Sequence, residues 1–288
     1  MTINRRSFFF YVTLLLALFA FVGHTDAKQR KGKKLTALDR YVAKPDPNYS
    51  YKITNTLKKE GFTVYVVRLT SQQWRTAAEV DRPIWEHWMT ITQPDEVASP
   101  TAFMFISGGS VNSKEPGVPS PIFTDMAVRT KSVVAELKMI PYEPLTFAGE
   151  TKSRNEDAII SYTWEKFMRT GDENWPLRLP MTKASVRALD TITAVAASTE
   201  GGKKATKVEK FIVSGGSKRG WTTWTTAVVD DRVIAIVPYV IDCLNLEKSL
   251  EHHFRAYGFW APAVRDYLNT VTWAGTPQHK ALMDIEDP

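Results

Sequence analysis

Three short apolar runs, each closed by a turn, constrain the fold of this chain more than any other feature. They cover residues 101–106, 208–214 and 233–241. Runs of this length that are apolar throughout are typical of strands buried on both faces, as in a parallel sheet. The helical patterns that alternate with them cover residues 155–168, 182–197 and 221–229. The sequence therefore predicts an α/β fold, with a mostly parallel central sheet and helices on both faces.

The segments around these runs add weaker signals. Strand patterns at 62–69 and 85–92 suggest a hairpin-like start, and a short strand is expected at 145–148. Apolar residues at helical spacing predict a helix over 124–137. A hairpin followed by βα units fits an α/β-hydrolase, and it also fits other doubly wound folds.

The second apolar run leads into the sequence GGSKRG, in which Ser217 stands between a predicted strand and a predicted helix. A nucleophile elbow requires small residues around its serine, because strand and helix pass very close together. Gly215 fits this pattern, whereas Arg219 stands where a glycine is expected and Gly220 comes one position late. Three interpretations remain open for this turn: a nucleophile elbow, an anion-binding helix N-terminus, and a purely structural turn.

An acyl-transfer site also needs two backbone donors for the oxyanion. The N–H that follows the nucleophile belongs to Lys218, and the loop after the first buried strand contains Gly108 and Gly109. These two glycines let the backbone turn its N–H groups towards the elbow, if the loop is more than a plain strand-ending turn.

A serine nucleophile needs an acid and a histidine that follow it in the chain. Asp242 comes at the end of the third run, where an acid is presented at the edge of such a sheet. His252 and His253 fall in a helical pattern and are expected to pack or face solvent, and His279 falls in a loop-like segment. Cys243 is the only cysteine and follows an apolar run, so we expect a buried thiol and no intramolecular disulfide.

The N-terminus has the pattern of an export signal. Arg5 and Arg6 precede an apolar stretch over 8–22, and Ala27 ends a small-residue cleavage site. The stretch is short for a membrane span, so residues 1–27 are expected to be a cleaved signal of the general secretory or twin-arginine type, with a retained anchor as the alternative. The protein is thus expected to be exported, to the periplasm or the outside of the cell.

The basic character of the chain is local. Residues 1–34 carry all of the net charge of +6, and residues 28–34 hold most of it, so residues 35–288 are neutral overall. A nucleic-acid partner therefore loses its main support, and the basic tail 28–34 is expected at most to touch an anionic surface. The 288 residues are 43% hydrophobic, which is enough for one domain over 35–288.

Several longer runs are similar to one family. These are TALDRYVAKPDPNYSY, EDAIISYTWEKFM, WPLRLPMTKASVRALDTI, GGSKRGWTTWTTAVVDDRVIAIVPYVID and LNLEKSLEHHFRAYGFWAPAV. Together they resemble the PhoPQ-activated pathogenicity-related proteins over residues 35–288. The resemblance implies a secreted α/β-hydrolase fold with Ser217 at the elbow. It also implies that relatives continue with further strands that carry an acidic loop and an Asn-x-x-His segment, so the last strands and the base histidine are expected to lie beyond residue 288.

The elbow is also similar to that of the glucuronoyl esterases, which likewise lack a small residue two positions after the serine. By that similarity Arg219 is no obstacle to a nucleophile, and Lys218 is expected to bring positive charge beside an oxyanion or an acidic substrate. The sequence as a whole predicts a secreted, esterase-like serine hydrolase of unknown ester substrate, with no cofactor and no metal. The alternative is a non-catalytic extracellular signalling or binding protein on a hydrolase scaffold.

Overall fold

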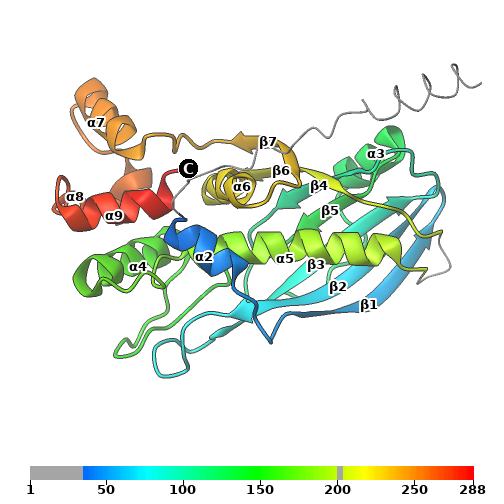
Figure 1. The fold of residues 1–288 in the computed structure, drawn as a ribbon, viewed down its shortest axis with the longest axis horizontal. Helices are drawn as coiled ribbons and strands as arrows, with labels where there is room; N and C mark the ends of the chain where they lie inside the picture. Colours follow the sequence, from blue (N-terminus) through cyan, green and yellow to red (C-terminus); the bar gives the residue numbers. More distant parts are fainter. Residues whose placement is uncertain (1–34, 200–203) are drawn as a thin grey trace, which may run out of the picture. The chain divides into compact units, whose positions relative to one another are not determined.

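A seven-stranded mixed sheet organises the chain (Figure 1). The computed structural model describes residues 35–199 and 204–288, and residues Thr36–Pro288 form one compact unit. The predicted signal and the basic tail lie outside the described residues. The strand order is β1-β2-β3-β5-β4-β6-β7. The strands are β1 Ser50–Lys59, β2 Phe62–Gln73, β3 Ile84–Pro94, β4 Thr101–Ile106, β5 Val134–Leu137, β6 Lys210–Gly216 and β7 Val233–Tyr239.

The sheet has an antiparallel part and a parallel part. Strands β1, β2 and β3 form a meander, and β3 also pairs antiparallel with β5. Strands β5, β4, β6 and β7 are mutually parallel, as the three apolar runs predicted. The hydrolase-like α/β prediction is therefore confirmed, with a larger antiparallel share than the apolar runs indicated.

Helices cover the two faces unequally. The long helix α5 (Arg178–Ala197) packs on β2, β3 and β5, and α6 (Lys218–Val229) packs on β6 and β7. The opposite face carries α3 (Pro121–Thr130), which packs mainly on β3 and β5 and contacts β4 through the rings of Phe123 and Phe105. The side chains that α3 leaves partly or fully open on this face include Phe103, Phe105 and Val237. The prediction of helices on both faces is confirmed, and the second face is only partly covered.

The remaining helices lie towards one end of the unit (Figure 1). They are α2 (Ala37–Ala43), α4 (Glu156–Thr170), α7 (Leu246–Tyr257), the 3-10 helix η2 (Pro262–Tyr267), α8 (Leu268–Val271) and α9 (Pro277–Glu286). Helices α4, α8 and α9 pack on one another or on η2 beyond the carboxyl ends of β6 and β7. No helix in the described ranges is long and apolar enough to cross a membrane.

Some local predictions were wrong. The segment 124–137 is not one helix: α3 ends at Thr130, and Val134–Leu137 is the central strand β5. The helix ends because Lys131 adopts the left-handed region at φ 49°. All four residues of β5 are buried, and so short a buried segment cannot be assigned to a helix or a strand from its sequence pattern. Residues 145–148 form isolated bridges in place of a strand, and strand β1 had no counterpart among the expectations.

Strand β7 is an edge strand among the described strands, and it contains a proline. The Ser217 N–H donates to the Tyr239 carbonyl at 3.0 Å, so Tyr239 and Val237 direct their backbone groups towards β6. Pro238 therefore faces away from β6, on the free edge, where the missing N–H removes a donor.

Candidate active site

Ser217 lies in a strained turn between β6 and α6. Its backbone angles are φ 54° and ψ −128°, which a residue with a side chain rarely adopts. The side chain is exposed at the carboxyl edge of the sheet. Strain of this kind persists where the surrounding structure imposes it, and it is the geometry of a nucleophile elbow. This observation favours the elbow over the two other interpretations of the turn.

Glycines permit the close passage of strand and helix at this turn. A Cβ added at Gly215 would lie 2.8 Å from the backbone carbon of Arg219, and one added at Gly220 would lie 2.7 Å from Cγ2 of Ile241 and 2.8 Å from the Gly215 carbonyl oxygen. The small residue after the serine is thus required at position 220. At position 219 the turn holds an arginine, whose guanidinium extends to Gly108 and to the Ile140 carbonyl.

The predicted oxyanion loop follows β4, the strand that pairs with β6 in register up to Ile106 and Gly215. Gly109 has φ 136° and is exposed. Lys218 is the first residue of α6, so its N–H has no acceptor within the helix. Of these three backbone positions, Lys218 lines the cavity beside Ser217, and the roles of Gly108 and Gly109 as oxyanion donors remain predictions.

The side chains of Lys218 and Arg219 have other partners. Lys218 is buried, and its Nζ lies 3.0 Å from Glu156 Oε2 and 3.3 Å from Asp157 Oδ2. Arg219 contacts Glu156 at 3.1 Å and Glu143 at 3.4 Å, and it donates to the Ile140 carbonyl. The Lys218 ammonium is thus already paired with two carboxylates, and its positive charge beside an oxyanion or an acidic substrate remains a prediction.

Arg219 connects the glycine loop to the elbow. A Cβ added at Gly108 would lie 2.6 Å from Nη2 of Arg219, so the guanidinium packs directly on the backbone of that loop. Arg219 therefore acts as a positioning residue in this arrangement and does not point into the cavity beside Ser217.

The two glutamates around Arg219 differ in their acidity. Burial raises the pKa of Glu143 above its usual value. The pKa of Glu156 is lowered: partial burial acts in the opposite direction, but the Lys218 ammonium and the Arg219 guanidinium outweigh it. The backbone N–H of Glu156 donates to the Glu143 carboxylate, and the Tyr267 hydroxyl donates to Asp157 Oδ1 at 2.7 Å. These contacts connect the start of α4 to η2 and to the elbow.

Ser217 opens into a cavity of about 310 Å³. Side chains of α4, α6, α7 and η2 line it, together with the segment that follows β7. Apolar groups such as Trp164, Trp221 and Leu250 alternate there with Asp157, Asp242 and His253. The size is that of a small-molecule site, and the mixture of apolar walls and a few polar groups is typical of one.

Asp242 lies where the sequence placed it, at the exposed end of β7. It lines the cavity of Ser217, and it accepts a hydrogen bond from Ser249 Oγ at 3.3 Å. Within residues 35–199 and 204–288 no histidine hydrogen-bonds to it, so no acid–histidine pair is assembled in the described part of the chain.

The three downstream histidines differ in position. His253 lines the Ser217 cavity, but its Nε2 accepts a hydrogen bond from the Ala261 N–H at 3.1 Å and its ring stacks on Trp260. His252 is exposed on α7, which confirms the helical prediction for both residues. His279 was expected in a loop; it lies in the first turn of α9, is buried, and lines a neighbouring cavity. No ring nitrogen in the described ranges hydrogen-bonds to Ser217.

A buried ion pair supports the elbow from behind, and sequence reasoning did not find it. Arg178 and Glu286 are both fully buried, with Nε and Oε2 3.2 Å apart. Arg178 also donates to the Lys218 carbonyl at 3.0 Å and to Thr222, and Trp164 donates to Glu286 at 2.8 Å. Burial raises the pKa of Glu286. The available signal was the charged residue inside the otherwise apolar WPLRLP run, which requires a buried partner.

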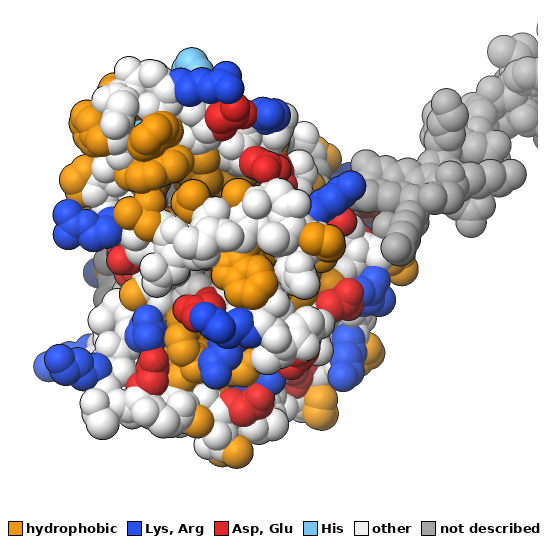
Figure 2. Space-filling view, turned by 90° about the vertical axis from the view of Figure 1, so that its left-hand side faces the viewer, with side chains coloured by type: hydrophobic (Ala, Val, Ile, Leu, Met, Phe, Trp, Pro, Cys, Tyr) orange, Lys and Arg blue, Asp and Glu red, His pale blue; other side chains and the backbone are white. Residues whose placement is uncertain are grey.

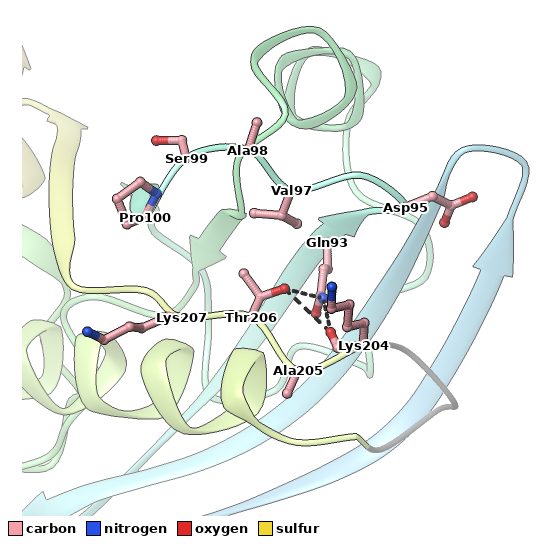
Figure 3. Close-up of a pocket in the computed structure, with 10 residues that line it drawn as sticks. All are labelled: Gln93, Asp95, Val97, Ala98, Ser99, Pro100, Lys204, Ala205, Thr206 and Lys207. Carbon is pink, nitrogen blue, oxygen red and sulfur yellow. Dashed lines mark hydrogen bonds between the residues drawn. The ribbon is translucent and has the colours of Figure 1, made fainter. Parts of the chain in front are cut away.

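Other chemistry has less support in the described residues. Cys243 is free and buried, and burial raises the pKa of its thiol to about 11, so the predicted inert thiol is confirmed. In the described ranges no group of three or more His, Cys, Asp or Glu side chains could hold a metal ion. A further pocket lies at the opposite, amino edge of β4 and β6, where Gln93 donates to the Lys204 carbonyl and to Thr206 (Figure 3). It contains none of the predicted site residues.

Comparison with known proteins identifies the family of this chain. The sequence profile of the PhoPQ-activated pathogenicity-related protein family matches residues 38–288. The chain belongs to that family. Autocrine proliferation repressor protein A of Dictyostelium discoideum is 40% identical to it over 258 residues, which is 88% of this chain and 51% of that protein. The PhoPQ-related chain thus spans about half the length of this curated relative.

The fold has solved counterparts. Acetyl xylan esterase 1 from Thermoanaerobacterium sp. superposes with a TM-score of 0.51 at 12% identity, covering 87% of this chain and 71% of the esterase. At this identity the similarity shows a common fold alone, and the PhoPQ-related chain thus has an α/β-hydrolase-like fold.

Proposed function

We propose that this PhoPQ-related protein is a serine hydrolase that cleaves a carboxylic ester, with Ser217 as its nucleophile. The observation that carries the proposal is the backbone of Ser217 at φ 54° and ψ −128°, with its side chain exposed towards a cavity. Strain at this position costs about 1–3 kcal/mol, and a turn without a function could relieve it with a glycine at 217.

The proposed chemistry uses the positions described above. Ser217 Oγ attacks the ester carbonyl carbon, and the Lys218 N–H and a Gly108–Gly109 N–H hold the developing oxyanion. The carbon–oxygen bond to the alcohol then breaks, the alcohol leaves with a proton, and water hydrolyses the acyl-serine. Asp242 is the proposed acid in the described part of the chain. No base is assigned there, because the Nε2 of His253 is engaged.

A fluorophosphonate probe tests this proposal on the whole protein as its native cells make it. We expect a covalent adduct on the peptide that contains Ser217, found by mass spectrometry, in the wild type and in Ser153→Ala. Ser153 is an exposed serine that does not line this cavity, so Ser153→Ala is the matched control. We expect no adduct in Ser217→Ala. Folded protein, verified by circular dichroism, that carries no adduct on Ser217 would contradict the hydrolase proposal.

The same experiment addresses a second candidate function. The absence, within the described ranges, of a histidine bonded to Ser217 favours a non-catalytic extracellular signalling or binding protein on this scaffold. A folded chain without labelling at Ser217 supports that reading.

We further propose that the protein is exported by the signal over residues 1–27. The apolar stretch behind Arg5 and Arg6 supports this proposal. Amino-terminal sequencing of the protein from its native cells should find a start at Lys28, and an intact Met1 in all of the protein would argue against cleavage.

A further inference from the structure

A second cavity lies directly behind the one that Ser217 lines. It has a volume of about 360 Å³ and lies among α7, α8 and α9. Trp164, Leu246 and Leu250 line both cavities, so the two share an apolar wall. Further apolar side chains that line the second cavity include Trp260, Val271 and Met283, and its polar lining includes the buried His279.

The shared wall is formed in part by a lightly packed helix. Leu246 is the only buried residue of α7. Phe254 and Tyr257, further along the helix, are 45% and 64% exposed. Figure 2 views the end of the molecule that carries these helices, and hydrophobic side chains gather on it at the height of α7. Leu250 can therefore move aside at low cost, because few buried contacts hold α7 in place.

The charges at the cavity do not suit an ionic ligand. Arg255, the cation that lines it, is paired with Glu251 at 2.6 Å, and Glu247 adds a further negative charge. A neutral apolar group fits the apolar part of this lining, because it does not compete with the Arg255–Glu251 pair and is not repelled by Glu247.

We propose that the second cavity receives the apolar acyl chain of the ester whose carbonyl reacts at Ser217. This inference rests on the proposed hydrolase function and names its substrate class: esters of acyl chains well beyond acetyl. The chain enters from the Ser217 cavity past Leu250 and lies along Trp164 towards Val271 and Met283. The acyl-serine keeps the chain in this cavity until water releases the acid.

Neutral ketones test the site without turnover. The straight-chain 2-ketones from 2-hexanone to 2-decanone carry a carbonyl and an alkyl chain but have no bond that a hydrolase cleaves. Titrated into the wild-type protein and followed by calorimetry and tryptophan fluorescence, they should bind about fourfold more tightly for each added methylene. Equal affinity of 2-hexanone and 2-decanone would overturn the inference.

Two matched variants test whether the alkyl chain of the ketone lies in the second cavity. Ala274 lines the second cavity and is exposed, so Ala274→Phe fills the cavity without disturbing the core. The variant should weaken 2-decanone binding at least about tenfold, because two or more methylenes of the ketone are then no longer buried. Ala256→Phe adds the same ring on an exposed part of α7 that lines neither cavity, and it should bind like the wild type. Equal affinity in Ala274→Phe and the wild type would also overturn the inference.

The result can be separated from that of the function itself. If Ser217 is labelled but ketone affinity does not depend on chain length, the acyl-chain proposal is refuted and the hydrolase proposal stands. If ketone affinity depends on chain length but Ser217 is not labelled, the cavity does not bind the acyl group of a substrate. That result overturns this inference.

Discussion

Among the histidines of the described chain, His87 has the pKa that departs most from its ordinary value, and it lies near the glycine loop. It is fully buried, with Nε2 2.9 Å from Ser71 Oγ and Nδ1 3.2 Å from the Met139 carbonyl. Met139 has φ 67°, and its N–H donates to the Gly108 carbonyl. Burial lowers the pKa of His87 to about 3. The neutral ring thus holds the segment on which the predicted oxyanion loop rests.

The pKa of His87 predicts the pH dependence of stability. The unfolded chain titrates near 6.5, so between pH 6.5 and 3 the unfolded state binds the extra proton, and stability falls as the pH falls. We expect the free energy of unfolding in urea to drop by about 1 kcal/mol per pH unit below pH 6 from this residue. His87→Gln should flatten that slope, and His252→Gln, at an exposed position, should not. Equal slopes in the wild type and His87→Gln would refute the assignment.

At the scale of residues, the sequence predicted the groups that a motif defines and missed those that only the fold brings together. Ser217, Lys218 and Gly108 were predictable because a turn and a loop each follow a recognisable strand. Glu143 was not, because 76 positions separate it from Arg219, and only the folded chain brings it to the elbow. His87 stands in an alternating strand pattern that gives no sign of complete burial.

The elbow is the element on which the candidate site depends. Its two ends are held by Gly215 and Gly220, where a Cβ would meet backbone atoms or the side chain of Ile241, which follows β7. The serine between them cannot relax while both contacts persist.

Gly220→Ala should therefore damage both stability and the site. The added methyl must displace Ile241 or the Gly215 carbonyl, and overpacking of this kind costs about 1–3 kcal/mol. We expect a lower urea midpoint together with loss of the fluorophosphonate adduct. Gly117→Ala is the control, because a Cβ there would meet no atom within 4 Å. A wild-type midpoint and full labelling in Gly220→Ala would show that the elbow is less tightly constrained than described.

The short length of one strand explains why a helix was predicted wrongly. Residues 124–137 have helical spacing of apolar groups, but the last four of them form β5, in which Val134, Ala135, Glu136 and Leu137 are all buried. A strand of four residues that includes a glutamate is too short to show a period of its own. The parallel strands β4 and β6 were predictable because their runs are longer and are bounded by glycines.

At the scale of the molecule, the face of the sheet away from α5 is only partly covered at β6 and β7. Ile234 and Val237 of β7 are 56% and 53% exposed, and Val240 beyond it is 79% exposed. An apolar edge strand with free backbone groups is a site for association between chains, which Pro238 limits but does not remove.

We therefore expect the 288-residue chain to self-associate at micromolar concentration. Ile234→Lys should weaken this association about tenfold, because a charge at a strand edge opposes pairing. Ile122→Lys is the matched control, since Ile122 is 64% exposed on α3, away from β7. Light scattering coupled to size-exclusion chromatography reads the result. A monomeric wild type with a cooperative unfolding transition would contradict this expectation.

The Arg178–Glu286 pair has one more consequence. The Lys218 carbonyl is held by Arg178, Arg178 is held by Glu286, and Glu286 belongs to α9, 69 residues after the serine. The N–H proposed to bind the oxyanion and the carbonyl held by Arg178 belong to the same residue. The geometry at Ser217 is therefore set partly by a distant helix, so a partner that binds and shifts α9 would alter the reactivity of Ser217 without entering its cavity.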